Sequence, residues 1–439
     1  MKWPPSHWFS PRASKSAPPP RRRLRLESLE DRAVPAVLHV TNLASDSAAV
    51  AGTLRHEIAI SAANDAIVFD IAGTLTLTNG ALTPNHTLTI NGLGPNLDVI
   101  NAGGSNRIID PNFSLADLTL SGLTLTGSHS IPYGAVTVQN GSLTIDHCTI
   151  TGNSASAASA IAATAGLTIT NSTVSGNTAL RGLGAIYAEG STKIANTTIS
   201  GNSGGGGGGG GLHFRGNSAA ASLTITGSTI SGNTATAGAG IYAIFSGGST
   251  ATITNSTISG NTATTGGGGG VFAFGTGALR LANDTVAGNT ARGGSGGGLS
   301  LAGGLTTTLL NTIVANNIDT TNRAPDISGT VIAAFSLVRS TKGATFTGFT
   351  GSDLFGFDPH LGPLQNNGGP TQTMALLAGS RAIDTGYDGV MGPPYFLTTD
   401  QRGHLRKAGT HVDIGAFEFG SPLPPTPPPL LPPRHGRIF

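Results

Sequence analysis

Carboxylates that could act as acids, bases or metal ligands are scarce in this chain of 439 residues. Between Leu118 and Asn317 the acidic residues are Asp146, Glu189 and Asp284. Cleavage of a glycan needs carboxylates that converge, either as an acid–base pair or around a calcium ion beside a basic group. These three acids occur in different copies of a repeated phrase and never recur at one position of it, so the sequence does not predict that they converge.

A second group of charged residues lies near the C-terminus, where the repeats have ended. A metal or catalytic cluster is one interpretation of this group. We favour a polar cap, in which acids and arginine pair, bind loop backbones and close the open end of a stack of repeats. The predicted cap residues are Asp384, Asp400, Arg402, Asp413 and Glu418. We therefore predict no catalytic residue, no metal ligand and no cofactor.

The repeated phrase has the form LTITNSTVSGNTA, and its copies are separated by 24 to 31 residues. It is short, rich in β-branched residues and alternates apolar with polar positions, which is typical of strands. A unit of this length that stacks on its own copies predicts an all-β fold, a right-handed parallel β-helix. An asparagine recurs in each copy, and we expect a buried ladder of amides formed by Asn153, Asn177, Asn202, Asn233, Asn261, Asn289 and Asn316.

A second strand follows each glycine-rich stretch, with copies such as GAIYAE and GGVFAF. Two apolar columns on this strand face inward, so the residue between them faces outward. On four consecutive turns the outward residue is Tyr187, His213, Tyr242 or Phe272, and Glu189 and Arg215 lie at the edge. We predict that these six residues bind a sugar or a partner protein, with stacking between turns as the alternative.

Composition limits the other classes of function. The net charge is only +2, and eight Lys or Arg against three acids fall within the first 35 residues, which excludes a basic nucleic-acid surface elsewhere. No apolar run is long enough to span a membrane. The single cysteine, Cys148, excludes an internal disulfide, and we expect a monomer. The predicted divisions are a disordered basic segment, the β-helix, its end with the cap, and a disordered proline-rich tail, at residues 1–35, 36–317, 318–420 and 421–439.

Several segments resemble known bacterial families. LRLESLEDRAVPA resembles the LEDR-type motif at the start of exported planctomycete proteins. VTNLASDSAAVAGTLRHEI resembles the opening of β-helices of the pectin-lyase-like superfamily, and GNTATTGGGGGVFAF resembles repeats of polymorphic outer-membrane proteins. The segment from DPHLGPLQNNGGPTQTM through TTDQRG to VDIGAFEF resembles the choice-of-anchor Q domain. The resemblance implies a secreted or surface β-helix.

Taken together, these observations predict a non-catalytic, extracellular or cell-surface β-helix that is adhesin-like or structural. Its partner would be a polysaccharide or a surface protein. The alternative is a polysaccharide lyase or glycoside hydrolase on the same scaffold, which would require acids that converge in a groove.

Overall fold

The structure, a computed structural model, describes residues 34–104, 106–111, 117–348 and 352–423. The whole coil lies within the unit that begins at Pro35. The predicted disordered segments 1–35 and 421–439 lie almost entirely outside the described residues, so the structure does not test them.

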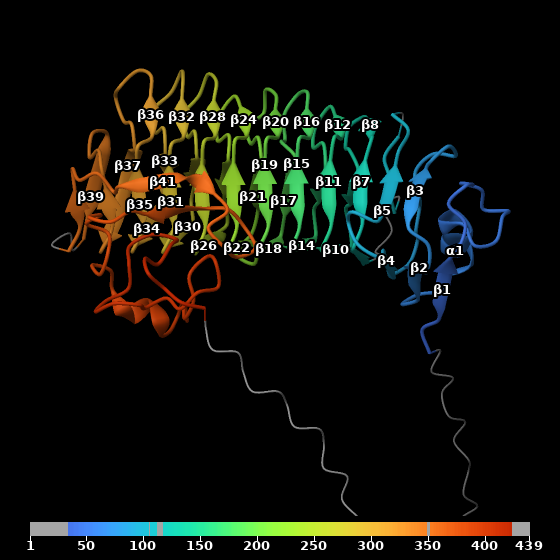
Figure 1. Cartoon of the computed structure of the whole chain (residues 1–439). Helices are drawn as coiled ribbons and strands as arrows, with labels where there is room; N and C mark the ends of the chain where they lie inside the picture. Colours follow the sequence, from blue (N-terminus) through green and yellow to red (C-terminus); the bar gives the residue numbers. More distant parts are fainter. Residues whose placement is uncertain (1–33, 105, 112–116, 349–351, 424–439) are drawn as a thin grey trace, which may run out of the picture. The chain divides into compact units, whose positions relative to one another are not determined.

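The described residues form the predicted parallel coil (Figure 1). A representative turn contains four strands, β25 (Ile241–Phe245), β26 (Thr250–Thr254), β27 (Thr257–Ser259) and β28 (Thr262–Ala263), where the sequence predicted at least two. Each strand pairs in parallel with its counterpart on the next turn. The strands of successive turns therefore build long sheets, which we call C, A, B and D in the order in which a turn meets them.

Sheet C contains β9 (Val136–Val138), β13 (Ile161–Ala163), β17 (Ile186–Glu189), β21 (Leu212–Gly216), β25, β29 (Val271–Gly275), β33 (Leu299–Gly303) and part of β37 (Ile327–Ala334). Sheet A contains β1 (Val37–Val40), β2 (Ala66–Phe69), β4 (Leu88–Asn91), β6 (Leu118–Ser121), β10 (Ser142–Asp146), β14 (Gly166–Thr170), β18 (Ser191–Ala195), β22 (Ser222–Thr226), β26, β30 (Ala278–Ala282), β34 (Thr306–Leu310), the rest of β37 and β39 (Ala344–Thr347). Sheet B contains β3 (Gly73–Thr76), β5 (Asp98–Asn101), β7 (Thr124–Thr126), β11 (Thr149–Thr151), β15 (Thr173–Ser175), β19 (Thr198–Ser200), β23 (Thr229–Ser231), β27, β31 (Thr285–Ala287), β35 (Ile313–Ala315), β38 (Leu337–Val338) and β40 (Leu354–Phe355). Sheet D contains β8 (His129–Ser130), β12 (Ser154–Ala155), β16 (Thr178–Ala179), β20 (Ser203–Gly204), β24 (Thr234–Ala235), β28, β32 (Thr290–Ala291) and β36 (Ile318–Asp319).

The short α-helix α1 (Leu54–Ile60) lies near the start of the coil. Thr53 is its N-cap, and the Thr53 hydroxyl accepts the His56 N–H. No helix in the described part of the chain is long and apolar enough to cross a membrane. Inside the coil, the first predicted apolar column of sheet C is buried throughout, from Val136 to Leu299. The predicted register of this strand is therefore confirmed.

The asparagine ladder is confirmed from Asn153 to Asn289. Each of these side chains donates its amide to the Oδ1 of the asparagine on the next turn, at 2.9–3.0 Å. The same oxygen also accepts the backbone N–H of the preceding asparagine. The ladder therefore satisfies backbone groups at the bend between sheets B and D that would otherwise be buried without partners.

The last predicted member of the ladder is wrong by one residue. Asn289 donates to Asn317, and not to Asn316. Asn316 has a φ of +59° and occupies the position that glycine takes on earlier turns, such as Gly288 with a φ of +69°. Asparagine tolerates this left-handed conformation better than most residues. Of the two adjacent asparagines, the first therefore forms the turn and the second forms the ladder.

A second ladder, which the sequence analysis missed, lines the bend between sheets A and B. The backbone N–H of one turn donates to a side-chain oxygen of the next, as in Ser228 N–H to Ser256 Oγ at 3.2 Å and Ser256 N–H to Asp284 Oδ1 at 2.8 Å. Cys148 occupies this position on an earlier turn, where it is buried. Asp284 is thus a buried structural carboxylate.

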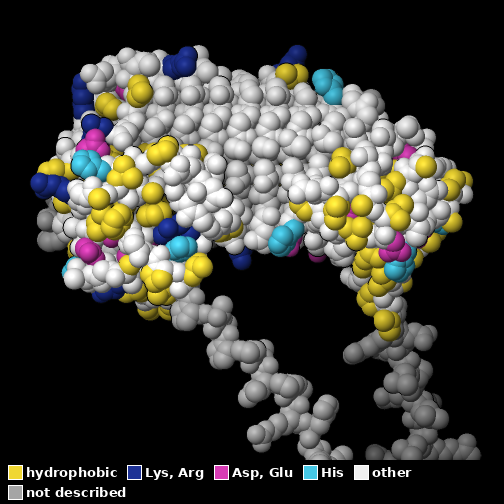
Figure 2. Space-filling view, in the orientation of Figure 1, with side chains coloured by type: hydrophobic (Ala, Val, Ile, Leu, Met, Phe, Trp, Pro, Cys, Tyr) yellow, Lys and Arg dark blue, Asp and Glu magenta, His cyan; other side chains and the backbone are white. Residues whose placement is uncertain are grey.

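Beyond the coil, residues 356–423 fold back against the outer face of sheet B, and we call them the flanking module. It contains the antiparallel pair β41 (Leu361–Gln365) and β42 (Thr373–Leu376) and the short helix η1 (Asp388–Met391). Figure 1 draws it in orange and red beside the later turns, and Figure 2 shows charged side chains over the module, over the last turns beside it and over the earliest turns. The middle of the viewed face carries almost none.

The flanking module binds the coil through threonines of sheet B. Thr229 donates its hydroxyl to the Gln372 carbonyl at 2.5 Å, and Thr257 donates to Gln401 Oε1 at 2.6 Å. An apolar cluster joins the same faces, with Ile313, Ala315 and Leu337 of the coil against Leu376, Ala382, Ile414 and Phe417 of the module. The module was expected to close the open end of the stack, and these contacts instead place it along the flank.

Candidate functional site

The four predicted aromatic residues of sheet C, which we call the aromatic strip, lie in register on consecutive turns. Tyr187 pairs with His213, His213 with Tyr242, and Tyr242 with Phe272. Their ring centroids are 5.5, 4.9 and 5.2 Å apart. The outward column and its alignment are therefore as the sequence predicted, and so is the stacking between turns that was the alternative to binding.

Half of the aromatic strip is covered. Tyr187 is only 7% exposed and His213 only 4%, whereas Tyr242 and Phe272 are half-buried. The glycine-rich segments between sheets D and C fold over the strip, and a Cβ on Gly208 would lie 2.5 Å from the Tyr242 ring. Only glycine permits so close an approach. The expectation that all four rings are open to a ligand is thus wrong for Tyr187 and His213.

The polar groups of the strip are largely engaged with one another. Tyr187 donates its hydroxyl to Glu189 Oε1, and Asn217 donates to Glu189 Oε2 at 3.3 Å. Arg215 lies 3.7 Å from Glu189, and its side chain is 58% exposed. Burial, followed by the hydrogen bond with Glu189, raises the pKa of Tyr187 to about 12. Both carboxylate oxygens of Glu189 therefore already accept a hydrogen bond, and Arg215 is the accessible charge at the edge.

His213 is a neutral structural residue rather than a general base. Burial lowers its pKa to about 4, with a smaller opposing effect from the hydrogen bond to Gly208. Its Nδ1 lies 3.3 Å from the Gly208 carbonyl, so this nitrogen carries the proton and donates it. The imidazole is enclosed between the Tyr187 and Tyr242 rings. It can stack, but it does not reach solvent to exchange a proton with a substrate.

The exposed end of the strip includes a residue that was missing from the predicted site. Phe274 is half-buried and packs edge-on against Tyr242 and Phe272, with centroids 5.8 and 5.7 Å away. The signal was present in the sequence, since Phe274 is the next outward residue after Phe272. On the following turn the register partners of these two phenylalanines are small, Ser300 and Ala302.

The change from large to small side chains forms what we call the aromatic step, made of Phe272 and Phe274 above Ser300 and Ala302. The Tyr242 and Phe272 rings are 8° from parallel, so one face of Phe272 packs on Tyr242. No further ring follows on the next turn, where Ser300 pairs with Phe272. The opposite face of Phe272 is therefore the position in the strip where a flat ligand ring can stack.

The acids of the coil do not converge. Asp146 binds Thr170 and Asn171, at 2.5 and 2.9 Å, on the outer side of sheet A. Asp284 is fully buried in the second ladder, and burial raises its pKa well above the usual value. Within the described ranges, no group of three or more His, Cys, Asp or Glu residues could hold a metal ion. Asp146 and Asp284 therefore do not form an acid–base pair with each other.

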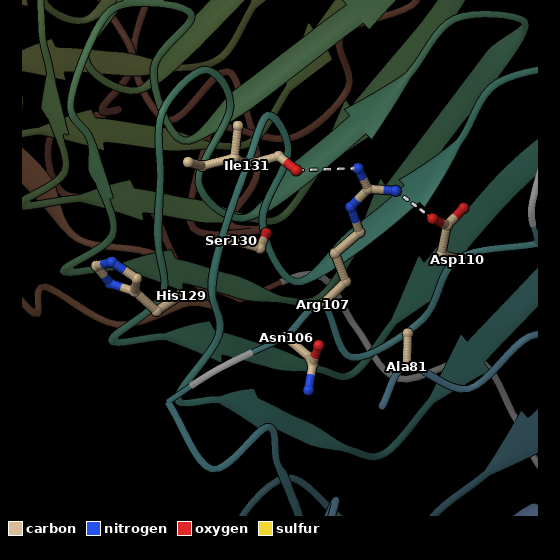
Figure 3. Close-up of a pocket in the computed structure, with 7 residues that line it drawn as sticks. All are labelled: Ala81, Asn106, Arg107, Asp110, His129, Ser130 and Ile131. Atoms are coloured by element: carbon tan, nitrogen blue, oxygen red, sulfur yellow. Dashed lines mark hydrogen bonds and ion pairs between the residues drawn. The ribbon is translucent and has the colours of Figure 1, made fainter. Parts of the chain in front are cut away.

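A hollow of 480 Å³ lies near the early turns, and the arginine in its wall, Arg107, is already bound by neighbouring groups (Figure 3). Arg107 forms an ion pair with Asp110 and donates to the carbonyls of Tyr133 and Ile131, at 3.3 and 3.5 Å. Figure 3 shows His129 on the opposite side, away from this pair. These bonds connect the loop before sheet C to the preceding turn, so the role of Arg107 is to hold this loop in place.

The predicted cap residues do come together, around an arginine that the sequence analysis missed. Arg402 donates to Asp400 Oδ2 at 2.8 Å and to the Glu418 carbonyl at 2.6 Å. Arg406 is fully buried beside Glu418 and donates to the Gly415 carbonyl at 3.0 Å.

The remaining acids of the cap bind backbone groups. Asp413 accepts the N–H groups of Asp384 and Phe419, at 2.7 and 2.6 Å. Burial raises the pKa of Asp413 to about 6 and that of Glu418 to about 8. The acids and arginines of this group pair and bind loop backbones, and the cluster is buried where the flanking module meets the coil, since Asn283 of the coil donates to the Asp413 carbonyl at 3.2 Å.

Comparison with known proteins agrees with the observed coil. Residues 133–348 match the family model described as a right handed beta helix region. Together with the parallel register, the match identifies the coil as the predicted right-handed β-helix. No curated protein matches the chain. Among solved structures, the chain is similar to the crystal structure of pectate lyase Pel9A, with 13% identity, a TM-score of 0.43 and coverage of 87% of this chain and 96% of that one.

Proposed function

We propose that this protein is a non-catalytic β-helix that acts outside the cell or at its surface and binds a polysaccharide at the aromatic step. The observation that carries the proposal is the end of the ring stack, where Phe272 and Phe274 meet a turn with Ser300 and Ala302. A pyranose ring has apolar C–H faces that stack on aromatic rings, and the small residues leave it room.

The rest of the aromatic strip supports a carbohydrate over a charged ligand, since its two charged residues lie two and three turns before Phe274. Arg215 and Glu189 lie at the edge of the strip and already form a pair, so they balance each other's charge. The exposed guanidinium retains donors for sugar hydroxyls. The strip is otherwise flanked by alanine and isoleucine side chains and by glycines of sheet C, which makes a mainly apolar contact surface.

The proposal that the protein is exported rests on the sequence resemblances. The LEDR-type motif and the choice-of-anchor Q resemblance of the flanking module support a secreted or surface-attached protein. The coil itself is suited to present a site at a distance, because its ladders and register repeat without interruption from turn to turn. A partner protein that carries the same glycan would bind in the same way.

A glycan array probed with residues 35–423 tests the proposal, with Ser300→Phe as the key variant. Phenylalanine at this position would extend the stack of rings by one turn. Its ring would lie over Gly267, just as the Tyr242 ring lies over Gly208. Gly267 is close enough for this, because a Cβ built on it would lie 2.9 Å from Ser300 Oγ. The variant should fold normally and lose binding on the order of tenfold or more. Thr308→Phe, which places the same ring on sheet A of the same turn, is the control and should bind normally. Equal binding by both variants would contradict the aromatic step.

A further inference from the structure

A second hollow, of 590 Å³, lies between the last turns of the coil and the flanking module. Its walls come from three parts of the chain: Phe335 at the bend between sheets A and B, Leu354 on the last strand of sheet B, and Tyr387, Asp388 and His411 of the module. It lies on a different sheet from the aromatic strip. Neither the predicted site nor the predicted cap included any of these five residues.

Phe335 adopts a backbone conformation that phenylalanine rarely takes. Its φ is +49°, and the equivalent bend residues on the three preceding turns are Asn255, Asn283 and Asn311, with φ of 48°, 56° and 48°. Asparagine tolerates this region, whereas a bulky residue is strained there. The preceding asparagines use their amides to bind the flanking module, as in Asn311 Nδ2 to the Tyr387 carbonyl at 3.1 Å. Phe335 has no amide to make such a bond, and its ring lines the hollow instead.

The ring of Phe335 forms an aromatic pair with Tyr387. The two centroids are 5.2 Å apart and the planes are tilted by 31°. Tyr387 is 48% exposed, so the pair does not serve to fill a closed core. Its backbone is held firmly, because the Tyr387 N–H donates to Asn311 Oδ1 at 2.7 Å. The hollow thus has a fixed and partly open aromatic wall.

A balanced set of polar groups faces this wall. Asp388 Oδ1 accepts the Val412 N–H at 2.9 Å, and its Oδ2 accepts Lys407 Nζ at 2.5 Å. His411 Nδ1 lies 3.4 Å from the same Oδ2, and its side chain is 58% exposed. Burial alone would raise the pKa of Asp388, but hydrogen bonds from Lys407, Val412 and His411 hold it below its usual value. The carboxylate stays ionised and can accept a further hydroxyl.

We propose that this hollow binds a neutral pyranose residue of a glycan, with the sugar face on Tyr387 and Phe335 and its hydroxyls on Asp388 and His411. Aromatic walls with a few oriented polar groups are typical of small-ligand sites. Lys407 already balances the charge of Asp388, which disfavours a cationic ligand in an aromatic cage and an anionic one alike. The proposal stands on this hollow alone and does not require the aromatic step to bind.

Saturation-transfer NMR on the full chain carrying Ser300→Phe, which removes sugar binding at the aromatic step, tests the proposal with four probes at equal concentration: methyl β-glucopyranoside, methyl β-galactopyranoside, choline and N-acetyl-tyrosinamide. At least one pyranoside should receive saturation, and Asp388→Asn should weaken its binding severalfold. A signal confined to choline or to the aromatic amide would overturn the assignment to a sugar, and so would no signal from any probe.

Phe335→Asn separates binding from folding, because it restores the residue that the bend usually carries. The variant should melt at the same temperature as the wild type or higher, while pyranoside binding falls on the order of tenfold. Phe419→Ser, which removes a 41% exposed aromatic ring elsewhere in the flanking module, should change neither. The same measurement with Ser300 intact reports any additional binding at the aromatic step, so failure here is distinguishable from failure of the aromatic step. Full binding by a folded Phe335→Asn variant would contradict the proposal.

Discussion

The side-chain amide of Asn289 donates to Oδ1 of Asn317 at 3.0 Å, and the backbone N–H of Asn289 donates to the same oxygen at 3.0 Å. Asn317 in turn donates to Asp326 Oδ1 at 2.8 Å. The neighbouring Asn316 takes no part and forms the left-handed turn. One oxygen therefore joins two turns of the coil, and two adjacent residues of the same type have different roles.

This difference gives a matched pair of variants. Asn317→Leu leaves the buried N–H groups of Asn289 without an acceptor and should cost about 2–4 kcal/mol of unfolding free energy. Asn316→Gly keeps a residue that favours a positive φ and should change stability by less than about 0.5 kcal/mol. Urea denaturation of both variants measures the difference. Similar losses in the two would contradict the assignment of the ladder to Asn317.

The aromatic strip should make the coil sensitive to acid. His213 has a pKa of about 4 in the folded state, below its ordinary value of 6.5, because burial disfavours its charged form. The unfolded chain then binds the extra proton first, so stability present above about pH 6.5 is lost as the pH falls toward 4. His213→Phe should reduce the loss between neutral pH and pH 4.5 by about 2 kcal/mol. Denaturation at both pH values measures it, with Tyr242→Phe as a control that should keep the wild-type dependence.

The flanking module should show the opposite dependence. Burial raises the pKa of Glu418 from 4.5 to about 8, so the folded state retains a proton that the unfolded chain loses. Its contribution is fully present below about pH 4.5 and is lost as the pH rises through 8. Glu418→Gln should flatten this decline by on the order of 2 kcal/mol. Calorimetric melting from pH 5 to 8.5 checks the slope, and an unchanged slope would show that another group causes it.

Removal of the flanking module should expose the outer face of sheet B. Ile313, Ala315 and Leu337 are fully buried, and they pack against the module's Ile414 and Phe417. A chain that ends at Phe355 should aggregate, because an apolar face and its strand edges become accessible. A chain that ends at Leu423 keeps the module and is the control. Light scattering distinguishes them, and a soluble monomer that ends at Phe355 would contradict a covering role.

The sequence predicted what repeats and missed what does not. The columns from Val136 to Leu299 and the asparagines up to Asn289 recur in phase, so their burial follows from period and alternation alone. The choice between Asn316 and Asn317 depends on a single φ angle, which composition does not reveal. The burial of Tyr187 and His213 depends on how far the glycine segments fold over sheet C, which is a tertiary contact.

The flank contacts of the C-terminal module could not be predicted for the same reason. Thr229 and Gln401 are 172 residues apart, and their hydrogen bond joins a repeat to a segment without a repeat. The charged residues Asp400, Arg402, Asp413 and Glu418 were recognised as a group that pairs, because acids beside arginines seldom remain unpaired when buried. Their position against sheet B, rather than over the end of the coil, needed the structure.

We propose that the protein binds glycans without cleaving them. Prolonged incubation with a glycan that it binds on the array tests this proposal. Residues 35–423 and the glycan that they bind on the array would be mixed at neutral pH with added calcium, and the sugar analysed by mass spectrometry. We expect the glycan to remain bound and intact, because Asp146, Glu189 and Asp284 do not converge. The contradicting result would be shortened glycan chains, with either an unsaturated end or a new reducing end, that form with the wild-type protein and no longer form when Glu189 is replaced.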